Sequence, residues 1–204
     1  MTPCLAQSNT PQMQLTAQNL TGRFVCLEPL SEAHREGLRA AASDPDLWAF
    51  MPVDGSGAGF DGWFDAALQT HASGAHIVFA VRRLPDGALA GSTRFLEIVP
   101  AHNRAEIGWT WYAKPAQAGM VNPECKYLLL DHAFSAGANR VELKTDARNA
   151  RSRAAIAKLG AKEEGIFRAH MVVRNGHIRD TVYFPIIRSE WPQVRSRLEA
   201  RLQQ

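Results

Sequence analysis

The sequence predicts a single α+β domain with a largely antiparallel sheet and helices on both faces. Strand-like segments are joined by hairpin turns at Pro85-Asp86-Gly87 and Asn175-Gly176. Between these hairpins the pattern changes to helix, strand and helix over residues 122–159. The length of 204 residues, with 46% hydrophobic and 21% charged residues, suits one soluble domain with a sizeable core.

The chain opens with a polar stretch over residues 1–20, rich in Gln, Asn, Thr and Pro. It lacks the basic start and apolar centre of a secretory signal. We predict a polar leader, flexible alone or docked on a partner subunit, ahead of one domain over residues 21–204.

The first half of the domain reads as helices interleaved with three consecutive antiparallel strands. Ser31 is the predicted cap of a helix over 34–42. Glycines make 53–62 a mobile loop. The other predicted elements are strands at 24–28, 77–83, 88–99 and 103–112, and helices at 44–50 and 60–71.

In the second half, helical and strand patterns alternate. The predicted helices cover 122–136, 149–159 and 190–202, and the predicted strands cover 140–145, 161–173 and 179–187.

The segment before the helix at 122 predicts an anion site. Asn122-Pro123-Glu124 is a strong helix start, with Asn122 as the cap, and the preceding loop 117–121 is small and free of acidic residues. Free amides at such a start, with the helix dipole, hold phosphate or pyrophosphate. A well-capped helix without a ligand is the alternative.

A second helix start, at Asn149, has a basic neighbourhood. Asn149 is either a cap or a hydrogen-bonding arm toward an amide-bearing ligand, and Ser152 lies one turn further on. A diphosphate with an extra ribose phosphate would use the nearby charges, and a solvated basic helix face is the alternative. These charges are Arg148, Arg151, Arg153 and Lys158.

Composition excludes several other functions. A net charge of +3 is too weak to argue for nucleic acid, and no apolar run approaches the ~20 residues that cross a membrane. Cys4, Cys26 and Cys125 form no metal spacing, so we predict free thiols in a cytoplasmic protein without a metal. Neither a P-loop nor a dinucleotide-binding motif occurs.

Four groups of residues together carry a resemblance to a known family. They are 105–109 on a central strand, the 117–122 turn, Asn149-x-x-Ser152 before Leu159-Gly160-Ala161, and Arg179-Asp180-Thr181-Val182 with Glu190-Trp191. Over residues 20–202 the chain resembles the GNAT acetyltransferase superfamily, and within it the ribosomal-protein N-terminal acetyltransferase (RimJ/RimL-like) branch.

The resemblance implies a three-layer α/β/α fold whose sheet splays at its centre. Acetyl-CoA would wedge between strands 106–112 and 141–145. Its pantetheine arm would pair with the main chain near Trp111 and Tyr112 and touch Asn149, with Ser152 and Arg153 close by. The loop that would hold the pyrophosphate comprises Gln117, Ala118, Gly119, Met120, Val121 and Asn122.

The implied reaction is attack of a neutral amine on the acetyl thioester. Glu106 matches the strand carboxylate that acts as general base in relatives, or it is a salt-bridged structural residue. Ser152 would protonate or hold the leaving thiolate, or it bonds locally within its helix. Ile156 stands where many relatives carry a tyrosine acid, which excludes that acid here. A main-chain N–H near Trp111 or Tyr112 would stabilise the oxyanion.

Aromatic and imidazole side chains have less defined roles. Trp48, Trp63, Trp109 and Trp111 are predicted core or cleft walls, and His132 a packed or surface residue. His170 and His177 flank the last hairpin and could line an acceptor groove.

We therefore predict a cytoplasmic N-acetyltransferase that moves acetyl from acetyl-CoA to a primary amine by direct transfer in a ternary complex. The acceptor is a protein N-terminus, an amino acid or a small amine, and the leader and last helix permit a homodimer. The alternative is a catalytically silent acyl-CoA-binding module that regulates a partner.

Overall fold

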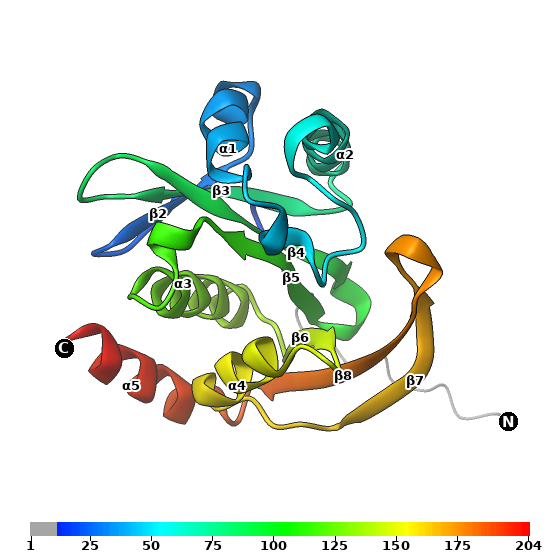
Figure 1. Cartoon of the computed structure of the whole chain (residues 1–204). Coiled ribbons are helices and arrows are strands. Elements are labelled where there is room, and N and C mark those ends of the chain that lie inside the picture. Colours follow the sequence, from blue (N-terminus) through cyan, green and yellow to red (C-terminus); the bar gives the residue numbers. More distant parts are fainter. Residues whose placement is uncertain (1–11) are drawn as a thin grey trace, which may run out of the picture.

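The computed structural model describes residues 12–204, which form an eight-stranded sheet between two layers of helices (Figure 1). The strands follow the order β1-β2-β3-β4-β5-β6-β8-β7. They are β1 Leu20–Thr21, β2 Val25–Pro29, β3 Ile77–Arg83, β4 Leu89–Val99, β5 Arg104–Tyr112, β6 Arg140–Asp146, β7 Gly165–Val172 and β8 Ile178–Ile187.

Five α-helices and six short 3-10 helices connect these strands within the described residues. The α-helices are α1 Arg35–Ala41, α2 Phe60–Ala72, α3 Val121–Ser135, α4 Ala150–Leu159 and α5 Trp191–Leu202. The 3-10 helices are η1 Glu32–His34, η2 Pro45–Trp48, η3 Gly57–Gly59, η4 Pro100–His102, η5 Lys114–Ala116 and η6 Arg174–Gly176.

Each face of the sheet has its own core. α1 and α2 cover one face, where Trp48, Trp63 and Trp111 pack together with ring centroids 5.3–5.4 Å apart. α3, α4 and α5 lie on the other face (Figure 1), over residues such as Leu129 and Ile186. Burial on both faces explains why β3 opens with a continuous apolar run over residues 77–81.

Most neighbouring strands are antiparallel, and the one parallel pair within residues 12–204 divides the sheet into two parts. β5 and β6 are parallel and pair over only three positions, Arg104–Arg140, Ala105–Val141 and Glu106–Glu142. Beyond these, β6 pairs with β8 over its whole length, while β5 stays with β4. The sheet is therefore splayed at its centre, which confirms the predicted fold class.

The prediction that Asn122 caps the next helix is wrong. α3 begins one residue earlier, at Val121, and Met120 is its N-cap, without a side-chain cap bond. Asn122 and Pro123 lie inside the first turn, where the missing proline N–H leaves no helix bond unmade. By contrast, Asn149 caps α4 as predicted, since its Oδ1 accepts from the Ser152 amide at 2.9 Å.

The predicted leader falls partly within the described residues. Met13 is buried, and its amide donates to Asn103 Oδ1 at 2.7 Å. His132 on α3 bonds the Thr16 carbonyl oxygen at 3.0 Å, so its role is packing, as predicted. Residues 12–20 thus dock on their own domain. Cys4 lies outside the described residues, whereas Cys26 and Cys125 are buried free thiols.

Candidate acetyl-transfer site

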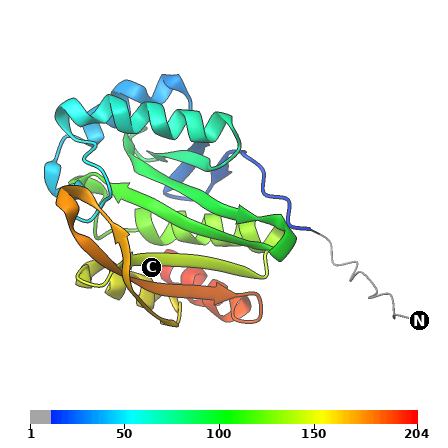
Figure 2. The ribbon, with the colours of Figure 1, turned by 90° about the vertical axis from the view of Figure 1, so that its right-hand side faces the viewer.

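The separation of β5 from β6 leaves one edge of β5 open (Figure 2, where α3 is visible between them). The Ala113 amide donates to Ala90 on β4 at 2.8 Å. Since successive amides of a strand point to opposite neighbours, the Tyr112 amide faces the open side and the Trp111 amide faces β4. Both side chains are buried in opposite cores, which fixes this orientation.

A bulge in β5 sets the direction of its last residues. The register with β4 shifts between Ser92 and Arg94, and Trp109 has a left-handed φ of 49°. One extra residue here turns the strand and alters its twist. The bulge therefore contributes to the divergence of β5 from β6.

The loop after β5 presents a row of unused amides. Within residues 12–204, the amides of 118–122 donate to no protein acceptor. Gln117 fastens the loop, because its Nε2 donates to Tyr112 O at 2.7 Å and its Oε1 accepts from Arg151 at 2.6 Å. Ala118 has a φ of 63° and a Cβ at Gly119 would meet no atom within 4 Å. Free amides at the start of a 15-residue helix are groups that favour an anion.

The start of α4 provides a hydroxyl without a protein partner. The Ser152 Oγ makes no hydrogen bond in the described part of the chain, so the predicted local bond is absent. The Asn149 side chain is engaged as the helix cap. Arg153 is also engaged, through Glu163 at 3.1 Å and the Ala147 carbonyl at 3.3 Å.

Glu106 is the buried carboxylate of the site. It is 2% exposed, and its Oε2 accepts from Lys144 Nζ at 2.8 Å. Burial raises the pKa of Glu106, against the opposing effect of Lys144. Its Oε1 makes no hydrogen bond within residues 12–204 and lies over Gly108, where an added Cβ would come within 2.8 Å of it. One oxygen of Glu106 is therefore held by Lys144, and the other has no hydrogen-bond partner within residues 12–204.

Lys144 is the partner that sequence reasoning missed. Burial lowers its pKa, and the Glu106 carboxylate more than compensates, so the pKa of Lys144 is raised. Its Nζ also lies 5.8 Å from the ring centroid of Tyr183 on β8. The sequence did carry a signal for this partner. Apolar residues 141 and 143 alternate with Glu142 and Lys144, which places Lys144 on the face that carries polar side chains.

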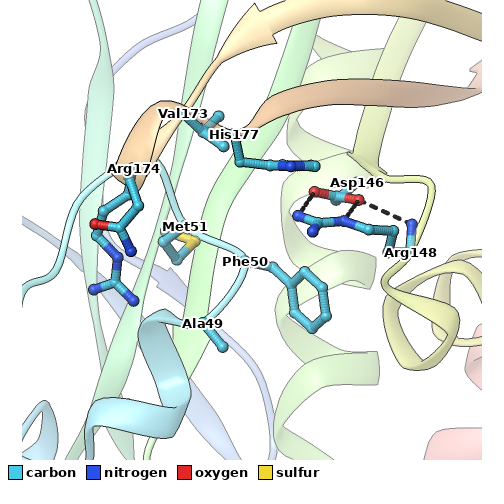
Figure 3. A pocket seen from close by; sticks show the side chains of 9 residues that line it. Ala49, Phe50, Met51, Asp146, Arg148, Val173, Arg174 and His177 are labelled. Atoms are coloured by element: carbon cyan, nitrogen blue, oxygen red, sulfur yellow. Dashed lines mark hydrogen bonds and ion pairs between the residues drawn. The ribbon is translucent and has the colours of Figure 1, made fainter.

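A cavity of about 220 Å³ opens beside the carboxyl end of β6 (Figure 3). Asp146 and Arg148 form one wall, paired through Oδ2 and Nη2 at 2.9 Å. The loop before α2 and the β7–β8 hairpin form the others, and Arg174 joins them by an ion pair with Asp54 at 2.5 Å. His177 is among the residues that line this cavity.

His170 lies elsewhere on the hairpin. It packs edge-on against Phe167 and Tyr183, with ring centroids 5.3 and 5.9 Å away. It is not among the residues that line the cavity of Figure 3.

The described residues contain neither a cluster of metal ligands nor a membrane-spanning helix. Between residues 12 and 204 no three His, Cys, Asp or Glu side chains gather as metal ligands would. None of the helices in that range has the length and apolar character needed to span a bilayer.

Comparison with known proteins identifies the class of this chain. The model of the acetyltransferase (GNAT) domain matches residues 25–162, and the chain belongs to the GNAT acetyltransferase family. It is therefore an acyltransferase, and its relatives support the RimJ/RimL-like branch.

Three relatives illustrate the similarity. A Brucella melitensis GCN5-related N-acetyltransferase structure is 31% identical, with a TM-score of 0.88, over 96% of this chain and 90% of that one. Mycobacterium smegmatis RimJ, solved with CoA-disulfide, is 25% identical with a TM-score of 0.73, over 87% and 88% of the two chains. The Bacillus subtilis (strain 168) "Putative ribosomal N-acetyltransferase YdaF" is 32% identical over 109 residues, 53% of this chain and 58% of its own length.

Proposed function

We propose that the protein transfers acetyl from acetyl-CoA to the primary amine of a peptide N-terminus or a small molecule. The observation that carries the proposal is the open edge of β5 beside the five amides of 118–122, which donate to no acceptor within residues 12–204. An extended arm fits a strand edge, and a diphosphate fits a helix start. The CoA-disulfide bound to M. smegmatis RimJ supports this choice of ligand.

The residues present fit acetyl-CoA at several points. The amides of Ala118, Gly119, Met120, Val121 and Asn122 would hold the pyrophosphate, with Gln117 fixing the loop. The Tyr112 amide would bond the pantetheine arm, next to Trp111. Asn149 would add its amide group, and Arg153 a positive charge. When bound, acetyl-CoA supplies the acetyl group as an activated thioester.

Glu106 would accept the proton of the amine. Its Oε1 makes no hydrogen bond with residues 12–204, and a raised carboxyl pKa makes a carboxylate a better base near neutrality. A free α-amine has a pKa near 8, so a weak base acting directly or through water is sufficient. Lys144 holds the other oxygen and keeps the carboxylate oriented.

Ser152 would serve the leaving sulfur. Its Oγ has no competing partner within residues 12–204 and sits in the first turn of α4, whose positive dipole end favours a developing negative charge. Ile156 is 7% exposed and belongs to the core, which agrees with the absence of a tyrosine acid at that position. Cytoplasmic activity is part of the proposal and fits the free thiols Cys26 and Cys125.

The test combines binding and turnover on the full chain. Calorimetry with CoA should show saturable uptake, and thiol release with acetyl-CoA should depend on an added amine from a panel of peptides and small amines. Binding without thiol release across the panel would favour the silent acyl-CoA-binding module. Absence of CoA binding would refute the proposal.

A further inference from the structure

A second cavity, of about 360 Å³, lies between α2, the loop before it and the central strands. Most of its wall is apolar, and one arginine, on β4, also lines it. The apolar wall is formed by Val53, Trp63, Ala66, Ala67 and Trp109, and the arginine is Arg94.

Arg94 is a buried charge without a counter-ion. It is 3% exposed, and it forms no ion pair with any residue of the described chain. Its Nη1 contacts His76 Nδ1 at 3.3 Å, and its guanidinium lies 4.8 Å from the ring centroid of Trp109. Nε and Nη2 have no hydrogen-bond partner among residues 12–204. A buried charged donor left unpaired is unfavourable, so such groups are rare unless water, an ion or a ligand completes them.

The two unpaired nitrogens of Arg94, Nε and Nη2, are the same pair with which other arginines of this chain bind carboxylates. Arg82 grips Glu28 through Nε at 2.7 Å and Nη2 at 2.9 Å. Arg148 grips Asp146 through Nε at 3.0 Å and Nη2 at 2.9 Å. Two parallel N–H bonds match the geometry of a carboxylate, so Arg94 has the unused half of such a pair.

Arg94 and Glu106 lie on the same face of the sheet. Arg94 pairs with Gly108, and Leu96 pairs with Glu106, so the four side-chain positions face the α1–α2 side together. Diagonal positions of this kind are about 7–8 Å apart. Glu106 itself is held by Lys144, which leaves Arg94 without a carboxylate although one is near.

We propose that the cavity at Arg94 binds a carboxylate of the acceptor, and that the enzyme prefers amines carrying a carboxylate on an apolar scaffold. The inference rests on the proposed function, since the amine must reach Glu106. In the present arrangement Nε and Nη2 are shielded from solvent. Binding therefore turns the guanidinium edge into the cavity, away from Trp109 or His76.

Two groups of a peptide acceptor can supply this carboxylate: its C-terminus and the side chain of its first residue. Experiment separates them in two arms. The first arm compares a dipeptide with an apolar second residue, as its free C-terminal acid and as its C-terminal amide. The second arm compares C-amidated peptides that begin with Glu or with Gln. Initial rates of thiol release give KM and kcat for wild type, Arg94→Lys and Arg94→Met. Arg83→Met is the matched control, because Arg83 is a sheet arginine whose ion pair with Asp86 lies on the surface.

In at least one arm, wild type should favour the charged acceptor by a KM about tenfold lower or more. Arg94→Met should raise that KM about ten- to hundredfold and leave the uncharged acceptor unaffected. Arg94→Lys should fall between them, since a lysine keeps the charge without the paired edge. A preference absent from both arms, or one that survives in Arg94→Met, would overturn the inference.

A binding measurement keeps this inference separate from the proposed function. Calorimetry without CoA compares 3-phenylpropionate with 3-phenylpropionamide on the same proteins. Selective uptake of the acid by wild type, lost in Arg94→Met and kept in Arg83→Met, supports the site even if no amine is acetylated. Equal or absent uptake of the two probes, together with indifferent kinetics, rules the site out.

Discussion

Replacing Arg94 by Met should stabilise the fold, because the arginine is buried and has no counter-ion among residues 12–204. Burial lowers the pKa of Arg94 well below its ordinary value, to about 10. A neutral pH lies below both values, so the whole penalty on the charged form is present at pH 7. That difference corresponds to about 3 kcal/mol.

Two favourable contacts are lost in Arg94→Met and reduce the gain. The stacking of the guanidinium on Trp109 contributes about 1 kcal/mol, and the bond to His76 about the same. His76 is part-exposed, so water can replace its lost partner. Methionine fills a similar volume and adapts to irregular space. The expected net gain is therefore about 1 kcal/mol, or about 3 °C in Tm for a chain of this length.

Urea unfolding followed by circular dichroism, with a check of reversibility, measures the change. Arg83→Met should remain within about 0.5 kcal/mol of wild type, as expected for an exposed ion pair. An Arg94→Met protein less stable than wild type by about 1 kcal/mol or more would show that Arg94 contributes to the fold. The premise of an uncompensated buried charge would then be wrong.

Three further perturbations test the site and its supports. Glu106→Gln should lower kcat and leave the affinity for CoA near normal. It should also remove the acidic limb of the pH–rate profile, whose midpoint in wild type should lie above the usual 4.5 because burial raises the pKa of Glu106. Unchanged turnover of Glu106→Gln at saturating amine would show that Glu106 takes no part in the chemistry. Asn149→Ala should weaken acetyl-CoA binding by about 1 kcal/mol or more in calorimetry; Asn149→Ser keeps a capping oxygen, so equal affinity in wild type and both variants would refute a binding role for the side-chain amide. Glu124→Gln should lower the free energy of unfolding by about 2–4 kcal/mol, because the buried Glu124 carboxylate accepts from the amides of 23, 24 and 25 at 2.6–2.8 Å; urea unfolding within about 0.5 kcal/mol of wild type would contradict this.

Local signals predicted most elements of the fold because each depends on a few neighbouring residues. Asn175 and Gly176 adopt φ values of 62° and 71°, which the sequence pair favours, and they form the predicted hairpin turn. The N-cap of α3 was placed two residues too late, at Asn122 instead of Met120, because Pro123 suits both starts: its missing N–H leaves no bond unmade in the first turn. Local chemistry does not distinguish them, whereas the path of the chain from β5 does.

Long-range pairings were harder to predict. Glu124 was interpreted as a first-turn helix acid, yet its carboxylate binds the turn before β2, about a hundred residues away in sequence. Glu106 was predicted from its place on a strand and from the family resemblance. Its partner Lys144 lies on the parallel neighbour β6, and no local motif specifies the register between β5 and β6. Such contacts depend on how strands are arranged across the sheet, which local residue patterns constrain weakly.

Several buried donors have no hydrogen-bond partner within residues 12–204. Arg94 on β4 and Arg179 on β8 are both buried with an unpaired Nε, and Thr181 beside Arg179 has an unpaired hydroxyl. Arg94 shares the sheet face of Glu106, and Arg179 feels its charge together with that of Asp146. A fold selected for stability alone would pair or replace such groups. They lie on strands on either side of the opening between β5 and β6, so under our proposal the acceptor would complete them.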